Sequence, residues 1–364
     1  MPEALKNAYS EDKLREFAQT IQSAYADFPA ENFITAVMDD SWDSLELKGR
    51  WNHITTVLGT CLPQDYIQAL NILKQIAPDC SDYFRIVLPN FVDIYGQDET
   101  YWDETMDALE VFTIGSSSEL AVRSFIMADE ERMMKQMRKW AQHENDEVRR
   151  LASEGCRPAL PWSPALTSFK KDPSPVLPIL EQLRNDPSAY VRKSVANNLN
   201  DISKTHPELV IQIAQNWQGE SDHADWIIKH ACRTLLKRGD RDALALFGFH
   251  DGESIDVLHF ELESTKDIPT ISIGDDLIFS FSVHTDKATK LRLEYSIDFV
   301  KKNGKTSRKV FQISETELAA GETKTHTKKH SFKDLSTRKH YPGTHAISLI
   351  TNGVERETLS FEVT

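Results

Sequence analysis

The spacing of apolar residues changes once along this 364-residue chain, near residue 250, and that change limits the folds open to it. Before that point, apolar residues recur every three or four positions, as on one face of an α-helix. After it they alternate with polar residues, as on a half-buried β-strand. The sequence therefore predicts a mainly α domain over 1–250 and a β domain over 253–364, with the boundary within 248–254.

Three segments of the helical part show the period clearly. The segment 129–141 has an apolar face of Met133, Met134, Met137 and Trp140. The segment 188–203 follows the helix-start signal Asp186-Pro187 and has an apolar face of Val191, Val195, Leu199 and Ile202. A third helix opens at His206-Pro207, with the face Leu209, Val210, Ile213, Ala214 and Trp217. Short polar or Pro-containing breaks separate the helices, so we expect antiparallel neighbours.

A weak internal repeat runs through the same region. The string NDEVRRLASEG from Asn145 resembles DPSAYVRKSVANNLND from Asp186, and their Val-Arg pairs stand 43 residues apart. The string ADWIIKHACRTLLKRGD from Ala224 fits the same frame about 37 residues later. Helix pairs that repeat every 40 to 47 residues are typical of HEAT repeats. The sequence thus predicts an α-α superhelix of HEAT-like repeats, each burying its apolar face against the next.

Six segments of the C-terminal part are rich in β-branched and aromatic residues: 255–263, 271–285, 289–300, 307–313, 323–332 and 345–349. We expect about seven short strands in all. Asn303-Gly304 and Asn352-Gly353 stand between such segments, and Asn-Gly is a strong two-residue hairpin signal. The pattern predicts an Ig-like β-sandwich. The Cys…Trp…Cys spacing of antibody domains is missing, so the prediction concerns the architecture only.

Composition and charge indicate the cellular compartment and the part of the chain that could bind a polyanion. The chain has no run of 18 apolar residues, no apolar leader after Met1, and four widely spaced cysteines, so we expect a cytoplasmic protein with reduced thiols. The net charge is −14, but residues 1–120 hold 7 basic against 21 acidic residues, while 121–240 hold 18 against 16. A polyanion would therefore bind the middle third or part of the C-terminal domain.

Known catalytic motifs, phosphate loops and metal-ligand spacings are absent from the sequence, so we expect no metal and no cofactor. The proline-rich segment 155–164 is the first unusual feature, because three prolines fix its backbone. It would present Trp162 and Arg157 to a ligand in fixed poses. The alternative is that Trp162 fills a gap between two repeats, since large aromatic side chains are usually buried.

Three acidic residues are candidates for chemistry, and each also has a plain structural explanation. Asp201 lies near a helix end, where the helix dipole disfavours it unless a cation faces it, but it would also fit an exposed charged face. Glu154 stands four residues after Arg150, which a surface ion pair would explain. Glu119 follows Gly115–Ser118 and would equally fit the first turn of a helix.

A set of basic residues is the remaining candidate. Lys229, Arg233 and Lys237 recur every four residues, and Arg192 and Lys193 lie one repeat earlier. Such a stripe would follow a line of phosphates, or simply face water.

Beyond these patterns, the middle third resembles a known family. The strings ELAVRSF from Glu119, HENDEVRRLASEGCRPALPW from His143 and DPSAYVRKSVANNLNDISKTHPELV from Asp186 resemble the DNA alkylation repair glycosylases built from HEAT-like repeats (AlkC and AlkD). The likeness is dense from about 115 to 250 and is closest to the AlkC branch, one subgroup of which carries a C-terminal Ig-like domain. GCRPALPW and SVANNLNDI are its most specific parts.

The resemblance implies an enzyme that removes cationic N3-alkylated bases, such as 3-methyladenine and 3-methylcytosine, from double-stranded DNA by hydrolysing the N-glycosidic bond. It implies a site of Glu119, Glu154, Trp162 and Asp201, and a target base left in the helix. Phosphates would contact Arg157, Arg192, Lys193, Lys229 and Arg233. We expect a monomer acting on nucleoid DNA. The alternatives are a HEAT-repeat scaffold without chemistry and a protein that binds damaged DNA without cutting it.

Overall fold

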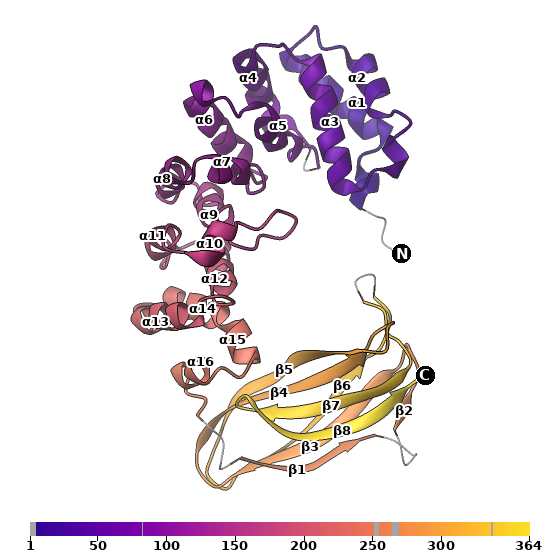
Figure 1. Ribbon diagram of the computed structural model, residues 1–364, viewed down its shortest axis with the longest axis vertical. Coiled ribbons are helices and arrows are strands. Elements are labelled where there is room, and N and C mark those ends of the chain that lie inside the picture. The colour runs from indigo at the N-terminus through magenta and orange to yellow at the C-terminus, as the bar shows by residue number, and fades with distance from the viewer. Residues whose placement is uncertain (1–4, 82, 251–254, 264–268, 336–337) are drawn as a thin grey trace. The chain divides into compact units, whose positions relative to one another are not determined.

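The computed structural model describes residues 5–81, 83–250, 255–263, 269–335 and 338–364 (Figure 1). The described chain divides into two compact units, one of Met1–His206 with Trp217–Ala231, the other of Pro207–Asn216 with Cys232–Thr364. Part of the boundary that we predicted, residues 251–254, lies outside the described residues. In this division into compact units, the helical residues from 232 onward group with the β domain. The division at 250 stays a prediction.

The first unit is built of helices that follow one another in chain order (Figure 1). Its α-helices are α1 (Glu11–Ala24), α2 (Ala30–Val37), α3 (Leu47–Cys61), α4 (Tyr66–Ile76), α5 (Val87–Tyr95), α6 (Trp102–Thr113), α7 (Val122–Ala128), α8 (Glu130–Trp140), α9 (Asp146–Glu154), α10 (Thr167–Lys171), α11 (Leu177–Gln182), α12 (Ala189–Ile202) and α14 (Asp222–Ala231). Its 3-10 helices are η1 (Leu5–Ala8), η2 (Trp42–Ser44), η3 (Ala77–Asp79) and η4 (Glu99–Tyr101).

The helix α8 shows how the sequence specifies these elements. Asp129 caps its N-terminus by accepting a hydrogen bond from the backbone NH of Arg132 at 3.0 Å. Acidic residues occupy its first turn and basic residues its last turn, which suits the helix dipole. Met133, Met134, Met137 and Trp140 are buried, which confirms the predicted face.

The internal repeat has a physical basis in its Val-Arg pairs. The Nη1 atom of Arg149 donates to the carbonyls of His143 and Glu144, six and five residues before it. Arg192 repeats the arrangement on the carbonyls of Asp186 and Pro187. Each arginine thus fixes the turn that enters its own helix. Arg149 also forms a two-pronged pair with the carboxylate of Asp186, at 2.6 and 3.0 Å, which joins one repeat to the next.

The second unit combines the last helices with the β domain. It contains α13 (Pro207–Trp217, apart from its final residue), α15 (Arg233–Lys237) and α16 (Arg241–Leu246). Its strands are β1 (Ile255–Leu262), β2 (Thr270–Ile271), β3 (Asp276–Thr285), β4 (Thr289–Val300), β5 (Thr306–Leu318), β6 (Thr323–Ser331), β7 (Gly343–Thr351) and β8 (Val354–Val363). The strand predicted over 271–285 is wrong in extent, because a turn at 272–275 separates β2 from β3.

The strands form two sheets, ordered β1-β3-β6 and β2-β8-β7-β4-β5. Every pairing is antiparallel except that of β2 with β8. Alternate residues of β3, β4 and β7 share one buried core, including Phe279, Phe281, Leu293 and Ile347. Two facing sheets with this topology confirm the Ig-like prediction in outline.

Both predicted Asn-Gly hairpins are present, joining β4 to β5 and β7 to β8. At the second turn, Asn352 and Gly353 have φ angles of 46° and 78°, the conformation that favours these two residue types. A Cβ atom on Gly353 would lie 2.6 Å from Cδ1 of Leu244 and 2.8 Å from Cα of Gly239. The tip of this hairpin therefore packs directly on the segment from α15 to α16, which explains why those helices belong to the second unit.

Candidate active site

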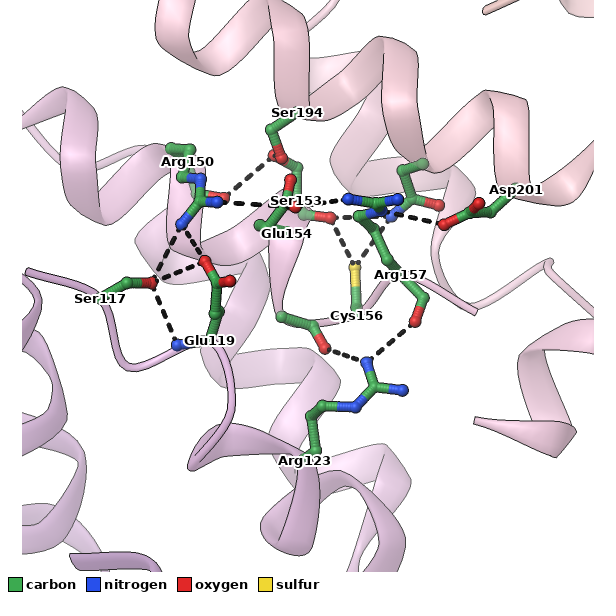
Figure 2. Close-up of polar contacts among 12 residues, drawn as sticks. Ser117, Glu119, Arg123, Arg150, Ser153, Glu154, Cys156, Arg157, Ser194 and Asp201 are labelled. Atoms are coloured by element: carbon green, nitrogen blue, oxygen red, sulfur yellow. Dashed lines mark hydrogen bonds and ion pairs between the residues drawn. The ribbon is translucent and has the colours of Figure 1, made fainter. Parts of the chain in front are cut away.

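Acidic and basic side chains alternate in a row that begins just before α7 and continues along α9 (Figure 2). Glu119, in the turn that precedes α7, accepts a hydrogen bond from Nη1 of Arg150 and one of 2.9 Å from the Ser117 hydroxyl. Nη2 of Arg150 lies 3.5 Å from Oε1 of Glu154, the last residue of α9. Arg150 therefore bridges two acids.

The row continues from α9 to α12. Nη1 of Arg157 donates to Oε1 of Glu154 at 2.5 Å, and its Nε donates to Oδ2 of Asp201 at 2.9 Å. Lys204 closes the row, with Nζ 2.8 Å from Oδ1 of Asp201. We call the six residues Glu119, Arg150, Glu154, Arg157, Asp201 and Lys204 the charge ladder. Its three acids and three bases leave it formally neutral.

The centre of the charge ladder is buried. Glu154 and Asp201 are each 5% exposed, and Arg157 is 9% exposed. Burial alone would lower the pKa of the Arg157 guanidinium, but Glu154 and Asp201 outweigh it and raise that pKa. Ionised groups at this depth are stable only when paired and hydrogen-bonded. An exposed Asp201 is therefore wrong, and the ion pair of Glu154 with Arg150 is present but lies buried and not at the surface.

Helix ends explain why the acids need these cations. Glu154 is the last residue of α9, and Asp201 stands next to the last of α12. A carboxylate near a helix C-terminus is disfavoured by the helix dipole. In each case a base three residues later compensates, Arg157 for Glu154 and Lys204 for Asp201. Glu119 differs, because it lies before α7 and outside its first turn, so the helix-dipole explanation for it is also wrong.

Polar contacts between α9 and α12 fix the helices that carry Glu154 and Asp201. The hydroxyls of Ser153 and Ser194 lie 2.6 Å apart, and Nδ2 of Asn198 donates to the carbonyl of Ser153 at 2.8 Å. Asn198 also contacts the sulfur of Cys156 at 3.5 Å. Burial raises the pKa of the Cys156 thiol to about 12, so this cysteine is a packing residue and no nucleophile at neutral pH.

One buried arginine holds the proline-rich loop after α9. Arg123, 1% exposed, donates to the carbonyls of Gly155 and Arg157 at 3.0 and 2.9 Å and to that of Pro164 at 3.2 Å. Burial lowers its pKa to about 10, which still leaves it charged at neutral pH. The guanidinium therefore ties both ends of the loop to α7.

Trp162 stands at the tip of this loop and is 64% exposed. Its φ of 64° is unusual for a residue with a side chain, and Nζ of Lys48 donates to its carbonyl at 2.6 Å. Its ring centre lies 6.3 Å from that of Trp51. The interpretation that Trp162 fills a gap between two repeats is therefore wrong. Its exposure agrees with the other interpretation, in which the rigid loop presents the side chain outward.

The predicted phosphate contacts differ in their surroundings. Arg157 is enclosed by two acids, and Nη1 of Arg192 is occupied by backbone carbonyls. Lys193 is exposed. The stripe of Lys229, Arg233 and Lys237 is divided between two helices, because α14 ends at Ala231 and α15 begins at Arg233. Their role with DNA stays a prediction.

Two broader expectations concern metals and membranes. Within the described ranges, no group of three or more His, Cys, Asp or Glu side chains is arranged to hold a metal ion. Among the described helices, none combines the length and apolar character needed to cross a membrane.

Comparisons with known proteins agree with this architecture. Residues 113–235 match the DNA alkylation repair enzyme family, and residues 261–364 match the C-terminal Ig-like domain of the uncharacterised protein YhaZ. The uncharacterized protein YhaZ of Bacillus subtilis is 48% identical over 359 residues, 99% of each chain. The structure of Pseudomonas fluorescens alkylpurine DNA glycosylase AlkC, bound to DNA containing an abasic site analog, is 35% identical, with a TM-score of 0.94 and full coverage of both chains. The chain belongs to the DNA alkylation repair enzyme family.

In this alkylation repair protein, sequence reasoning missed three residues that support the site. Arg150 appeared only as a surface partner of Glu154, although it also binds Glu119. Arg123 and Ser117 were not singled out. A third Val-Arg pair, Val122-Arg123, was a usable signal, because the Val-Arg arginines at 149 and 192 also bind backbone carbonyls.

Proposed function

We propose that this protein is a DNA glycosylase of base excision repair, which hydrolyses the N-glycosidic bond of cationic bases such as 3-methyladenine and 3-methylcytosine. Membership of the DNA alkylation repair enzyme family supports this activity. So does the full-length similarity to AlkC, which is described as an alkylpurine DNA glycosylase and was solved with DNA containing an abasic site analog. Its partner would be double-stranded DNA.

The observation that carries the proposal is the row of three carboxylates, Glu119, Glu154 and Asp201, on adjacent elements. An N3-alkylated base is already positively charged and leaves easily, so a strong general acid is unnecessary. The transition state places positive charge on the sugar, as in other glycoside cleavage. Fixed carboxylates in a site of low dielectric constant stabilise that charge and can orient the attacking water.

Each residue has a role in this proposal. Asp201 stabilises the sugar cation and positions the water, while Glu154 and Glu119 contact the lesion or its backbone. Trp162, exposed on its pinned loop, packs on the sugar or on the alkylated nucleotide. An indole face attracts a desolvated cation by about 2 kcal/mol.

The arginines divide into two groups. Because Arg157 is enclosed by Glu154 and Asp201, we assign it the positioning of those two acids in place of a phosphate contact. Phosphates would contact Lys193 and, with less freedom, Arg192. Lys229 and Arg233 complete the proposed set.

The test is release of methylated bases from duplex DNA under single-turnover conditions. We expect Asp201→Asn to lower the rate by about 100-fold or more, the usual cost of removing one preorganised electrostatic group. Glu119→Gln, at a less buried position, should show a smaller loss. Glu208→Gln, an exposed acid on α13, is the matched control and should cleave at the rate of the wild type.

Thermal melting of each variant separates loss of chemistry from loss of folding. Binding to a duplex with an abasic site analogue should change only a few-fold in Asp201→Asn. Equal rates in Asp201→Asn, Glu119→Gln and the wild type would refute the catalytic assignment. A wild type that binds damaged duplex but releases no base would be a recognition protein, and one that binds no DNA would be a scaffold.

A further inference from the structure

The tip of the proline-rich loop has a strained backbone. Pro161 and Trp162 occupy the two central positions of a turn in which the backbone NH of Ser163 donates to the carbonyl of Leu160 at 3.4 Å. A proline in the first of these positions and a positive φ in the second, here 64°, are typical of a type II turn. Glycine usually takes the second position, because a Cβ atom disfavours positive φ. A tryptophan there must be held by its surroundings, and strain of this kind is common at functional sites.

Packing supplies little of the support that the tip needs. Trp162 is 64% exposed, and a cavity of about 140 Å³ lies between the loop and the helices α3 and α5. Its wall includes Ser163 and Pro164 of the loop and Lys48 of α3. Arg123 binds carbonyls at the two ends of the loop but not at Trp162. The position of the tip therefore depends on contacts from α3.

Lys48, the second residue of α3, makes the polar contact with the tip. Its Nζ donates to the carbonyl of Trp162 at 2.6 Å, a bond that joins residues 114 positions apart. Hydrogen bonds from an ionised donor are stronger than neutral ones. The half-buried Asp93 of α5 attracts the same ammonium: burial raises the pKa of Asp93, and Ser124 and Lys48 lower it. The lysine thus reaches from a carboxylate to the carbonyl of the strained residue.

Trp51, three residues after Lys48 and on the same face of α3, lies next to the indole of Trp162. The two ring centres are 6.3 Å apart, with the planes inclined by 57°. Trp51 is 8% exposed, and its Nε1 donates to the Tyr9 hydroxyl, which donates to the carbonyl of Tyr83, both at 2.6 Å. Burial raises the pKa of Tyr9 to about 12, so its hydroxyl keeps its proton at neutral pH. The Trp162 indole therefore lies against a ring whose orientation is fixed.

We propose that Lys48 is a positioning residue of the candidate active site, which holds the Trp162 indole in the pose that meets the alkylated nucleotide. The inference rests on the proposed function, in which Trp162 packs on the sugar or on that nucleotide. An indole already held in place needs no further ordering when DNA binds. Lys48 lies outside residues 113–235, the segment that matches the family, so the first third of the chain takes part in the reaction through Trp162.

The first test is base release under single-turnover conditions by Lys48→Met, which removes the donor and keeps a side chain of similar length. We expect a rate about 10-fold lower, less than the roughly 100-fold that a misplacement of about 1 Å can cost. Lys48→Arg keeps a cationic donor and should restore most of the rate. Lys74→Met is the matched control, since Lys74 on α4 also donates a 2.8 Å hydrogen bond, to Asp107, and this variant should cleave like the wild type. Melting temperatures check that the variants fold.

A double-mutant cycle separates positioning from direct contact with DNA. If Lys48 acts through Trp162, adding Lys48→Met to Trp162→Ala should lower the rate by no more than about 2-fold. An equal loss of rate in both backgrounds would refute the positioning role. So would weaker binding of Lys48→Met to undamaged duplex together with a reduced salt dependence, because that result would make Lys48 a phosphate contact.

Fluorine NMR of the full-length protein labelled with 5-fluorotryptophan examines the loop without DNA. The chain has seven tryptophans, and the resonance of Trp162 is the one that Trp162→Phe removes. We expect this resonance to move in Lys48→Met, to return towards its original position in Lys48→Arg, and to stay unchanged in Lys74→Met. A Trp162 resonance that does not move in Lys48→Met would mean that the lysine does not hold the tip, and the inference would be wrong.

Failure of the inference and failure of the proposed function give different results. If the wild type releases bases and Lys48→Met or Trp162→Ala releases them at the same rate, the inference is wrong and the glycosylase function stands. If the wild type releases no base, the glycosylase function fails, and the Trp162 resonance still decides whether Lys48 holds the loop.

Discussion

Replacement of Arg157 by methionine is the sharpest test of the charge ladder. The substitution keeps most of the side-chain volume but removes the guanidinium that contacts Glu154 at 2.5 Å and Asp201 at 2.9 Å. Breaking a buried ion pair from one side costs about 3–5 kcal/mol, because the remaining charge is left without a partner. Arg150 still faces Glu154, and Lys204 still faces Asp201. We therefore expect a loss of unfolding free energy near the lower figure, about 3 kcal/mol.

Urea unfolding followed by far-ultraviolet circular dichroism measures this loss. A change of about 3 kcal/mol corresponds to roughly 6–12 °C in melting temperature for a unit of this size. Arg184→Met is the matched control, since Arg184 also contacts two acids, Glu181 and Glu220, but its side chain is 35% exposed. Its loss should stay below about 1 kcal/mol.

Neutralising the two acids should reverse much of the effect. In a variant that combines Arg157→Met with Glu154→Gln and Asp201→Asn, no unpaired carboxylate remains beside the methionine, so stability should recover by at least about 1 kcal/mol. An Arg157→Met protein as stable as the wild type would refute the reasoning. So would a combined variant no more stable than Arg157→Met alone, because the loss would then come from packing.

Two further predictions concern pH and salt. Burial lowers the pKa of His330 in the β-sandwich to about 4, with Arg338 and His340 adding to the effect. Between about pH 6.5 and 4, His330 is protonated in the unfolded chain but not in the folded sandwich. The contribution of His330 to the stability of the sandwich is therefore fully present above pH 6.5 and falls as the pH drops toward 4. We expect urea unfolding to show that the free energy of unfolding falls by about 2–3 kcal/mol between pH 7 and 4.5. In His330→Phe this loss should be smaller. A loss in His330→Phe equal to that of the wild type would contradict the assignment. Lys193→Ala should weaken binding to damaged and undamaged duplex alike and reduce the salt dependence by about one phosphate contact, measured by fluorescence anisotropy; weaker binding to damaged duplex alone would argue for base contact instead.

Much of the fold could be predicted from the sequence because local patterns determine it. The buried face of α8, the Val-Arg repeat and the two Asn-Gly hairpins each depend on residues close together in the chain. The strand predicted over 271–285 failed because the period-two pattern does not reveal the turn at 272–275. The stripe from Lys229 to Lys237 is divided between two helices because nothing local marks the break at Cys232, and its role with DNA stays a prediction.

The candidate site was harder to predict, because the contacts that join its helical segments link residues 31 and 44 positions apart. Spacing placed Arg150 and Glu154 on one helix face, but it could not reveal that Arg150 also reaches Glu119. The burial of Asp201 depends on Arg157, 44 residues earlier in the chain. Only packing between repeats brings such charges together. The sequence therefore indicated which charged residues matter but not which residues they pair with.

The distances within the charge ladder also depend on the spacing between successive repeats. The pair of Glu119 with Arg150 spans the step from the turn before α7 to α9, and that of Arg157 with Asp201 spans the step to α12. Ion pairs of this kind tolerate little change in length before their strength falls. A bend or twist of the helical stack would therefore alter the distances between the acids, and the spacing of the three carboxylates is set by the curvature of the scaffold as well as by their own side chains.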